Sequence, residues 1–233
     1  MKKIGIVGGL GPEATVEYYK EITGYFNKAA NGEDIHYPDI VIYSLDMWGF
    51  LKLFDNKKFD EAVELIVKCL DKLKMAGADF AVISANTPHL LFNQIQAISK
   101  IPLISIVDCV REKAVNLGVK RCGLFGTRFT MKADFYKNNF HKNGIEVFSP
   151  GEDEIEFINH KLFSEIELGI FREETKNELL DIVKKMIHRN KIDSLILGCT
   201  EFPLIFRNEK YFDIPFLNTV RIHVDKIISE CLA

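Results

Sequence analysis

The sequence lacks an excess of basic residues, since its 233 residues include 30 Lys and Arg against 33 Asp and Glu. Without such an excess we expect no nucleic-acid partner. Long apolar runs are also missing. The longest stretch without Asp, Glu, Lys or Arg, residues 80–99, contains Asn, Gln and His side chains that are costly in lipid, so we expect no membrane partner. The run that begins at Ile4 is too short for a secretory signal and reads better as a buried strand, which predicts a cytoplasmic protein.

Cysteines are few, and no two of them have the CxxC spacing of zinc or redox motifs. An odd, sparse count fits a reducing compartment better than a disulfide scaffold. HExxH and DxDxDG patterns are missing as well, so we predict no metal site. What remains to be explained is whether any one cysteine takes part in chemistry, among Cys69, Cys109, Cys122, Cys199 and Cys231.

The sequence does contain a regular alternation of short β-branched runs and helix-period segments. Apolar residues recur at helical spacing in Phe59–Met75 and Glu173–Ile187, and Gly77 and Gly118 are typical of helix ends. The predicted strands are Ile4–Gly8, Ile40–Ser44, Phe80–Ser84, Leu103–Ile106, Arg121–Phe125, Glu146–Phe148, Ser194–Leu197 and Pro215–Leu217. This alternation predicts an α/β fold with parallel sheets and helices on both faces.

An internal repeat divides the chain. Asp79–Thr87 and Asp193–Glu201 each consist of an Asp, an apolar strand, a small residue and then polar groups. Gly5–Gly9 and Gly123–Thr127 also match, at nearly the same separation along the chain. Two matching segments predict two copies of one α/β unit, although strand ends of this kind can resemble one another by coincidence.

The repeat predicts an N-terminal domain at 1–105, a C-terminal domain at 106–212, and a last segment, 213–233, that packs back on the first domain. In parallel α/β sheets, ligands bind beyond the carboxyl ends of the strands. Ala85 and Cys199 follow equivalent strands, so we expect them to face one cleft.

A glycine-rich turn, Gly8–Thr15, follows the first predicted strand and opens a helix. Read from Gly9, it satisfies the GxGxxA pattern of dinucleotide-binding proteins. Pro12, however, removes a backbone N–H that a pyrophosphate would need, and Asp46 lies much further on than the usual ~20 residues. Two interpretations are favoured instead: a turn that lets the backbone approach a small carboxylate, or a tight turn only.

Polar residues follow two other predicted strands. Asn86 and Thr87 can cap a helix or donate hydrogen bonds to a carboxylate, and His89 is interpreted as a supporting residue. Cys199 ends a strand just before a helix, where the helix dipole favours a thiolate. Glu201 would oppose this effect unless it is hydrogen-bonded elsewhere. The other four cysteines are interpreted as packing residues.

Four segments together resemble motifs of the aspartate/glutamate racemase family, which are cofactor-independent amino-acid racemases. They are Gly8–Thr15, Asn86–His89, Phe125–Thr127 and Leu197–Glu201. The resemblance implies two pseudo-symmetric Rossmann-like α/β domains with parallel sheets, an active site between the domains, no cofactor and a homodimer.

The family's mechanism uses two thiols, one on each face of the substrate α-carbon, because racemisation needs a base and an acid on opposite sides. Cys199 matches the second thiol, whereas the first thiol falls at Ala85, whose methyl group cannot move a proton. Ser84, Thr87, His89 or a bound water are the candidates that could replace it. Ser84 is expected to point to the other side of its strand.

The resemblance also assigns supporting roles. His89 and Glu201 are expected behind the residues that touch the substrate. Lys161 is expected to pair with a side-chain carboxylate, with a solvated helix lysine as the alternative, and Leu45–Trp48 offers no cation for that carboxylate. The full set of expected substrate-binding residues is Gly9, Gly11, Asn86, Thr87, Thr127, Lys161 and Thr200.

Three functions stay open at this stage. The favoured one is an amino-acid racemase of the aspartate/glutamate type, acting on a small amino acid or dicarboxylate and missing one thiol. The second is a single-thiol decarboxylase or isomerase on the same scaffold, for example one acting on arylmalonates. The third is a non-catalytic protein that binds a small carboxylate.

Overall fold

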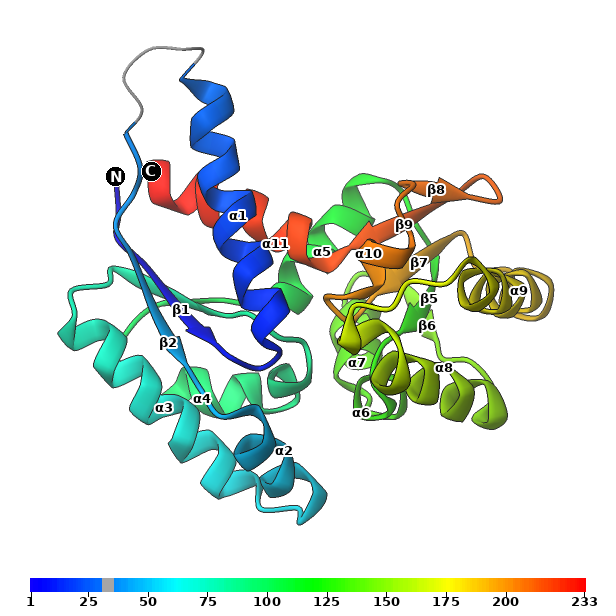
Figure 1. The fold of residues 1–233 in the computed structure, drawn as a ribbon, viewed down its shortest axis with the longest axis horizontal. Helices are drawn as coiled ribbons and strands as arrows, with labels where there is room; N and C mark the ends of the chain where they lie inside the picture. The colour runs from blue at the N-terminus through cyan, green and yellow to red at the C-terminus, as the bar shows by residue number, and fades with distance from the viewer. Residues whose placement is uncertain (31–35) are drawn as a thin grey trace. The chain divides into compact units, whose positions relative to one another are not determined.

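The computed structural model describes residues 1–30 and 36–233, which form two compact units (Figure 1). Unit 1 comprises Met1–Ile106 and His223–Ala233, and unit 2 comprises Val107–Ile222. Within the described ranges, none of the helices combines the length and the apolar character needed to cross a membrane.

Unit 1 is built on a parallel sheet with the strand order β2-β1-β3-β4. The last helix of the chain, α11 (Thr219–Leu232), contributes its residues from His223 onward to this unit. The other elements of unit 1 are β1 (Ile4–Gly8), α1 (Pro12–Ala29), β2 (Ile40–Ser44), α2 (Met47–Asp55), α3 (Phe59–Met75), β3 (Phe80–Ile83), the 3-10 helix η1 (Thr87–Leu91), α4 (Phe92–Ile98) and β4 (Leu103–Ile104).

Both faces of the unit 1 sheet are buried at its central strands, β1 and β3, whose side chains alternate between the two faces. On one face, Val7 and Ile83 pack in a core with α3 residues such as Ile66. Ile6 and Val82 point to the opposite face and are fully buried too. Figure 1 shows α1 and α11 on the side of β1 that faces away from α3. The strand ends of this sheet are therefore fixed between two helical layers.

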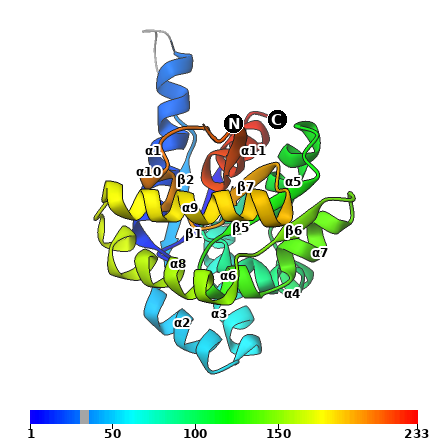
Figure 2. The ribbon, with the colours of Figure 1, turned by 90° about the vertical axis from the view of Figure 1, so that its right-hand side faces the viewer.

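Unit 2 is built on a sheet with the order β6-β5-β7-β9-β8, in which β8 is antiparallel and the other strands are parallel. Figure 2 shows α8 and α9 side by side, and both supply residues to the core on one face of this sheet. The elements are α5 (Ile106–Asn116), β5 (Arg121–Phe125), α6 (Arg128–Lys132), α7 (Phe135–His141), β6 (Glu146–Phe148), α8 (Glu152–Ser164), η2 (Ile166–Leu168), α9 (Glu173–Asn190), β7 (Ser194–Leu197), α10 (Phe202–Ile205), β8 (Lys210–Tyr211) and β9 (Ile214–Asn218).

The two sheets repeat one topology. In unit 1 the first, second, third and fourth strands have the order 2-1-3-4, and β5, β6, β7 and β9 have the same order in unit 2. The repeat segments coincide with β1 and β5 and with β3 and β7. The predicted α/β fold of two domains with parallel sheets is therefore confirmed.

Most predicted elements form where the sequence places them. The predicted helix Phe59–Met75 is α3, and Gly77 and Gly118 follow helices with φ values of +87° and +71°, which favour glycine. The predicted strand Leu103–Ile106 is wrong at its end, because β4 stops at Ile104 and Ile106 begins α5.

The predicted last segment, 213–233, is divided in the structure. Its first part, β9, is hydrogen-bonded to β7 in unit 2. Its last part lies in unit 1, where the Lys2 N–H donates to the Cys231 carbonyl at 2.8 Å and the Lys2 Nζ lies 2.5 Å from Glu230 Oε1. The division falls inside α11 because one continuous helix carries residues of both units.

Candidate active site

The turn after β1 needs glycine at position 9. Gly9 has a φ of +81°, and a Cβ there would lie 2.3 Å from the Leu45 carbonyl oxygen. The Gly9 N–H donates to Thr15 Oγ1 at 2.8 Å, so this donor is already used within unit 1. Gly11 precedes Pro12, the first residue of α1, which has no N–H to offer. These two features weigh against a pyrophosphate at this turn.

The polar groups at the end of β3 are hydrogen-bonded to other residues of unit 1. Ser84 Oγ donates to the Val7 carbonyl at 3.2 Å. The Ile106 N–H donates to His89 Nε2 at 3.2 Å, so Nδ1 carries the proton and donates to the Ala85 carbonyl at 2.9 Å. His89 is thus a neutral side chain with both ring nitrogens bonded, in keeping with a supporting role.

Ala85 lies at the carboxyl end of β3, where the family resemblance puts the first thiol. Its side chain is buried, and a methyl group neither donates nor accepts a proton. Asn86 is also buried and leads into η1, which begins at Thr87. Unit 1 therefore offers amide and hydroxyl groups at this strand end, but no thiol.

A thiol–carboxylate cluster lies at the carboxyl end of β7 in unit 2. The Cys199 Sγ donates to Glu201 Oε2 at 2.8 Å, and Thr200 Oγ1 donates to the same oxygen at 2.8 Å. Glu167, from η2, places its Oε1 3.8 Å from the Cys199 Sγ. Cys199, Thr200 and Glu201 are buried, and Glu167 is half-buried. Each carboxylate can thus receive a proton from the thiol.

The electrostatics of this cluster differ from the prediction that a helix dipole stabilises a thiolate. Burial raises the pKa of Cys199 well above its ordinary value of 9.0, and the negative charges of Glu201 and Glu167 raise it further. The helix that follows, α10, is only four residues long. The prediction is therefore wrong for the resting state, in which Cys199 is a thiol.

Glu167 is the residue that the sequence analysis missed. Burial and the neighbouring charge of Glu201 raise its pKa from 4.5 to about 7. It lies in a 3-10 turn far from Cys199 along the chain, so neither spacing nor periodicity links the two. A carboxyl group with a pKa near neutrality exchanges protons readily at physiological pH.

Lys161 is engaged within unit 2. Its Nζ lies 3.0 Å from Glu165 Oε1 and 3.3 Å from Glu178 Oε2. Thr175 Oγ1 donates to the other oxygen of Glu165. These contacts connect α8 to α9, so Lys161 already has two carboxylate partners.

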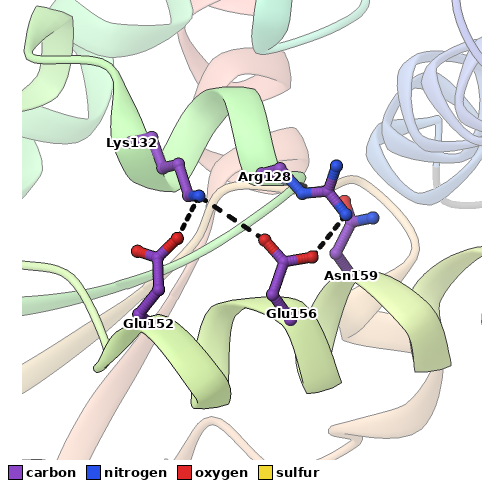
Figure 3. Close-up of polar contacts among 5 residues, drawn as sticks. All are labelled: Arg128, Lys132, Glu152, Glu156 and Asn159. Carbon is purple, nitrogen blue, oxygen red and sulfur yellow. Dashed lines mark hydrogen bonds and ion pairs between the residues drawn. The ribbon is translucent and has the colours of Figure 1, made fainter.

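Thr127 caps α6. Its Oγ1 accepts a hydrogen bond from the Thr130 N–H at 3.2 Å. Figure 3 shows how α6 is attached to α8: Lys132 pairs with Glu152 and Glu156, and Arg128 pairs with Glu156. The Arg128 N–H also donates to the Asn159 side chain at 2.8 Å. Thr127 therefore lies at the start of a helix that ion pairs attach to α8, directly after β5.

The Cys199 cluster attracts positive charge. One donor atom each from Glu167, Cys199 and Glu201 lie within 4.8 Å of one another, which is close enough to hold a metal ion. Glu201 Oε1 is buried and has no hydrogen-bond partner among residues 1–30 and 36–233. The cluster can thus accept a metal cation or a protonated amine.

The fold and the site together define a class of protein. Its members are two-domain α/β proteins with a thiol at a strand end of the second domain. The chain belongs to the Asp/Glu/Hydantoin racemase family, whose model matches residues 7–227.

Solved structures of relatives cover the whole chain. A putative Asp/Glu racemase from Yersinia pestis is 31% identical with a TM-score of 0.88, and an aspartate racemase homologue from Pyrococcus horikoshii is 33% identical with a TM-score of 0.85. Each comparison covers 100% of both chains. These similarities agree with the two-domain fold described above.

Among curated proteins, the broad specificity amino-acid racemase RacX of Bacillus subtilis is 30% identical over 146 residues. That match covers 62% of this chain and 63% of the relative, so the aligned region spans less than two thirds of the relative's length.

Proposed function

We propose that this protein is a cofactor-independent amino-acid racemase that uses Cys199 as its single thiol. The observation that carries the proposal is the 2.8 Å contact between the Cys199 Sγ and Glu201 Oε2 at the carboxyl end of β7. A thiol beside a carboxylate can accept a proton on sulfur while it passes its own proton on. Membership of the racemase family supports the same chemistry.

In the proposed reaction, the bond between the α-carbon and its hydrogen breaks and the proton moves to the Cys199 sulfur. The thiol proton passes at the same time to the Glu201 or Glu167 carboxylate, 2.8 and 3.8 Å away. The electron pair stays on the α-carbon and is delocalised into the substrate carboxylate, which Asn86, Thr87, Thr127 and Thr200 are proposed to bind. Since Glu167 has a pKa of about 7, a carboxylate is available near neutral pH.

Racemisation also requires a proton for the opposite face of the carbanion. Ala85 cannot supply it, and Ser84 and His89 are hydrogen-bonded within unit 1. We therefore assign this proton to a water molecule. Water is a weaker acid–base group than a thiol, so this half-reaction is slower than the half-reaction at Cys199.

The test is exchange of the α-hydrogen in D₂O for both enantiomers of a panel of amino acids, read by NMR. We expect one enantiomer to exchange faster than it racemises, and Cys199→Ala to abolish that exchange. Cys69→Ala is the matched control, because Cys69 is buried in α3 and outside the site. The Cys69→Ala variant should exchange the α-hydrogen at the rate of the unmodified protein.

The same assay separates the alternatives. No exchange of either enantiomer would refute racemase chemistry, and binding without exchange would identify a carboxylate-binding protein. Release of CO₂ from arylmalonates would identify a decarboxylase. A doubly negative malonate would meet the carboxylates of Glu167 and Glu201, so the local charge favours the racemase.

Three further properties complete the proposal. Racemisation should survive exhaustive dialysis with a chelator, because no bound cofactor is required. The enzyme should be a homodimer by light scattering. All five cysteines are free, which supports a reducing cytoplasm as its location.

A further inference from the structure

The turn η2 carries Glu167 and is short. It comprises three residues, and a single 3-10 turn of this length has too few hydrogen bonds of its own to fix its position. Ile166 of this turn is buried in the core of unit 2, and the next residue, Glu167, places its Oε1 3.8 Å from the Cys199 Sγ. Whatever holds η2 therefore sets the distance between this carboxylate and the thiol.

The backbone of Glu165 closes the turn. Its N–H donates to the Lys161 carbonyl at 3.1 Å, which is the last bond of α8. Its carbonyl accepts hydrogen bonds from the N–H groups of Leu168 and Ile170, each at 3.0 Å. Gly169 lies between these two donors with a φ of +73°, a conformation that favours glycine. The chain of η2 is thus wrapped around one carbonyl group.

The side chain of Glu165 is anchored as well. Thr175 Oγ1 donates to its Oε2, and Lys161 Nζ lies 3.0 Å from its Oε1. Thr175 is fully buried in the first turn of α9, and Lys161 belongs to α8, which Figure 2 shows beside α9. A buried carboxylate is stable only when its oxygens are bonded. These two contacts therefore fix Glu165 between the two helices.

From this arrangement we propose that Glu165 and Thr175 are positioning residues, which hold Glu167 at the distance from Cys199 that proton transfer needs. The inference rests on the proposed racemase function and assigns the thiol proton to Glu167. As sulfur takes the proton of the α-carbon, its own proton moves to Glu167 Oε1. Transfer of this kind is steep in distance, and a misplacement of about 1 Å can lower a rate by about 10²-fold.

The Thr175 hydroxyl is the contact that can be removed with the smallest change of shape. Without it, Glu165 Oε2 is a buried acceptor that has lost its donor, so the carboxylate must turn away or take up a proton. The same residue supplies the carbonyl around which η2 is wrapped, so this change is passed on to Glu167. The effect should appear in kcat, because neither Glu165 nor Thr175 is proposed to bind substrate.

The experiment is a double-mutant cycle between Thr175→Val and Glu167→Gln in the D₂O exchange assay. The probe is whichever of aspartate, glutamate, alanine and lysine exchanges fastest. We expect Thr175→Val to lower kcat by about tenfold and to leave KM within about twofold. In the Glu167→Gln background, where Glu201 still accepts the thiol proton, Thr175→Val should change kcat by less than about twofold.

Two further variants separate positioning from general stability. Thr175→Ser keeps the hydroxyl, so its kcat should stay within about twofold of the unmodified protein. Ser194→Ala removes another fully buried hydroxyl of unit 2, which donates to Cys122 Sγ at 3.1 Å at the start of β7. It should lower the melting temperature and leave kcat within about twofold.

The outcomes are distinguishable. An unchanged kcat in Thr175→Val, an equal fall in both backgrounds, or an equal fall in Thr175→Ser would overturn this inference and leave Glu201 as the acceptor in a racemase. No exchange of any amino acid by the unmodified protein would overturn the proposed function itself. Thermal melts show whether each variant is folded. If Thr175→Val is not, the same cycle with Glu165→Gln decides, with the same expected fall in kcat of about tenfold.

Discussion

The Cys199 thiol and the Thr200 hydroxyl donate to the same oxygen of Glu201, each at 2.8 Å. Two neighbouring donors on one oxygen fix the carboxylate in place. The arrangement makes Glu201 both the acceptor for the thiol proton and a negative charge that keeps sulfur protonated. Removing that charge should therefore make the Cys199 thiol more acidic and the enzyme less active.

Glu201→Gln tests this relationship. The amide cannot accept the thiol proton as a base, so we expect exchange of the α-hydrogen to fall by about 10²-fold or more. The pKa of Cys199 should fall, because one neighbouring negative charge is lost. Thiolate absorbance against pH measures the pKa. Glu209→Gln, at an exposed carboxylate of unit 2, is the control, and an unchanged Cys199 pKa in Glu201→Gln would contradict the assignment.

Lys161→Gln distinguishes a structural lysine from a substrate-binding one. Because Glu165 and Glu178 already hold the Nζ, we expect a lower melting temperature and KM values within about twofold of the unmodified enzyme. Lys184→Gln, on the exposed side of α9, should change neither quantity. A KM for dicarboxylates that rises about tenfold with an unchanged melting temperature would restore the role that the family resemblance implies.

Cys199 and Glu167 illustrate what the sequence can predict and what it cannot. Cys199 is recognisable because a strand pattern ends directly before it, and α3 is recognisable from its apolar period, since both signals are local. Glu167 carries no such signal, because its contact with Cys199 arises only when η2 and the end of β7 come together. The ion pair between Lys161 and Glu178 likewise depends on how α9 packs against α8. Local patterns therefore predict the fold and the thiol, and tertiary packing sets the charge around it.

Glu167→Gln should make the protein more stable at alkaline pH. The pKa of Glu167 is about 7 in the folded protein against an ordinary value of 4.5, so the folded state binds more protons between these values. Stability is then lost as pH rises through this window, because Glu167 ionises beside Glu201 and Cys199. We expect the free energy of unfolding of the variant to exceed that of the unmodified protein by on the order of 1 kcal/mol at pH 8. This corresponds to about 2–4 °C in melting temperature, and we expect little difference at pH 4. An equal gain at both pH values in thermal melts, or the same gain in Glu156→Gln, would contradict this.

His223→Gln tests a buried histidine in unit 1. The Tyr18 hydroxyl donates to His223 Nδ1 at 2.7 Å, and His223 Nε2 donates to the Ile104 carbonyl at 3.1 Å. Burial lowers the pKa of His223 to about 3, so the unfolded chain binds the extra proton as pH falls below about 6.5, and stability falls with it. The free energy of unfolding of the variant should be lower than that of the unmodified protein by about 1–3 kcal/mol at pH 7. This difference should become smaller at pH 5. Urea unfolding measures both values, and a deficit that grows at pH 5, or a similar loss in the exposed control His141→Gln, would contradict the assignment.

Ala85→Cys tests the missing thiol. The proposed mechanism has a strong acid–base group on one face of the α-carbon only, so a thiol at the end of β3 should supply the other face. We expect the racemisation rate to rise by about 10²-fold or more toward the rate of single-enantiomer exchange, measured by chiral chromatography alongside NMR. The double variant Ala85→Cys with Cys199→Ala should exchange the opposite enantiomer. Ala97→Cys adds a thiol to the exposed side of α4 and should change neither rate, because that side chain faces solvent. If Ala85→Cys folds and leaves racemisation unchanged, the two strand ends do not act on one α-carbon.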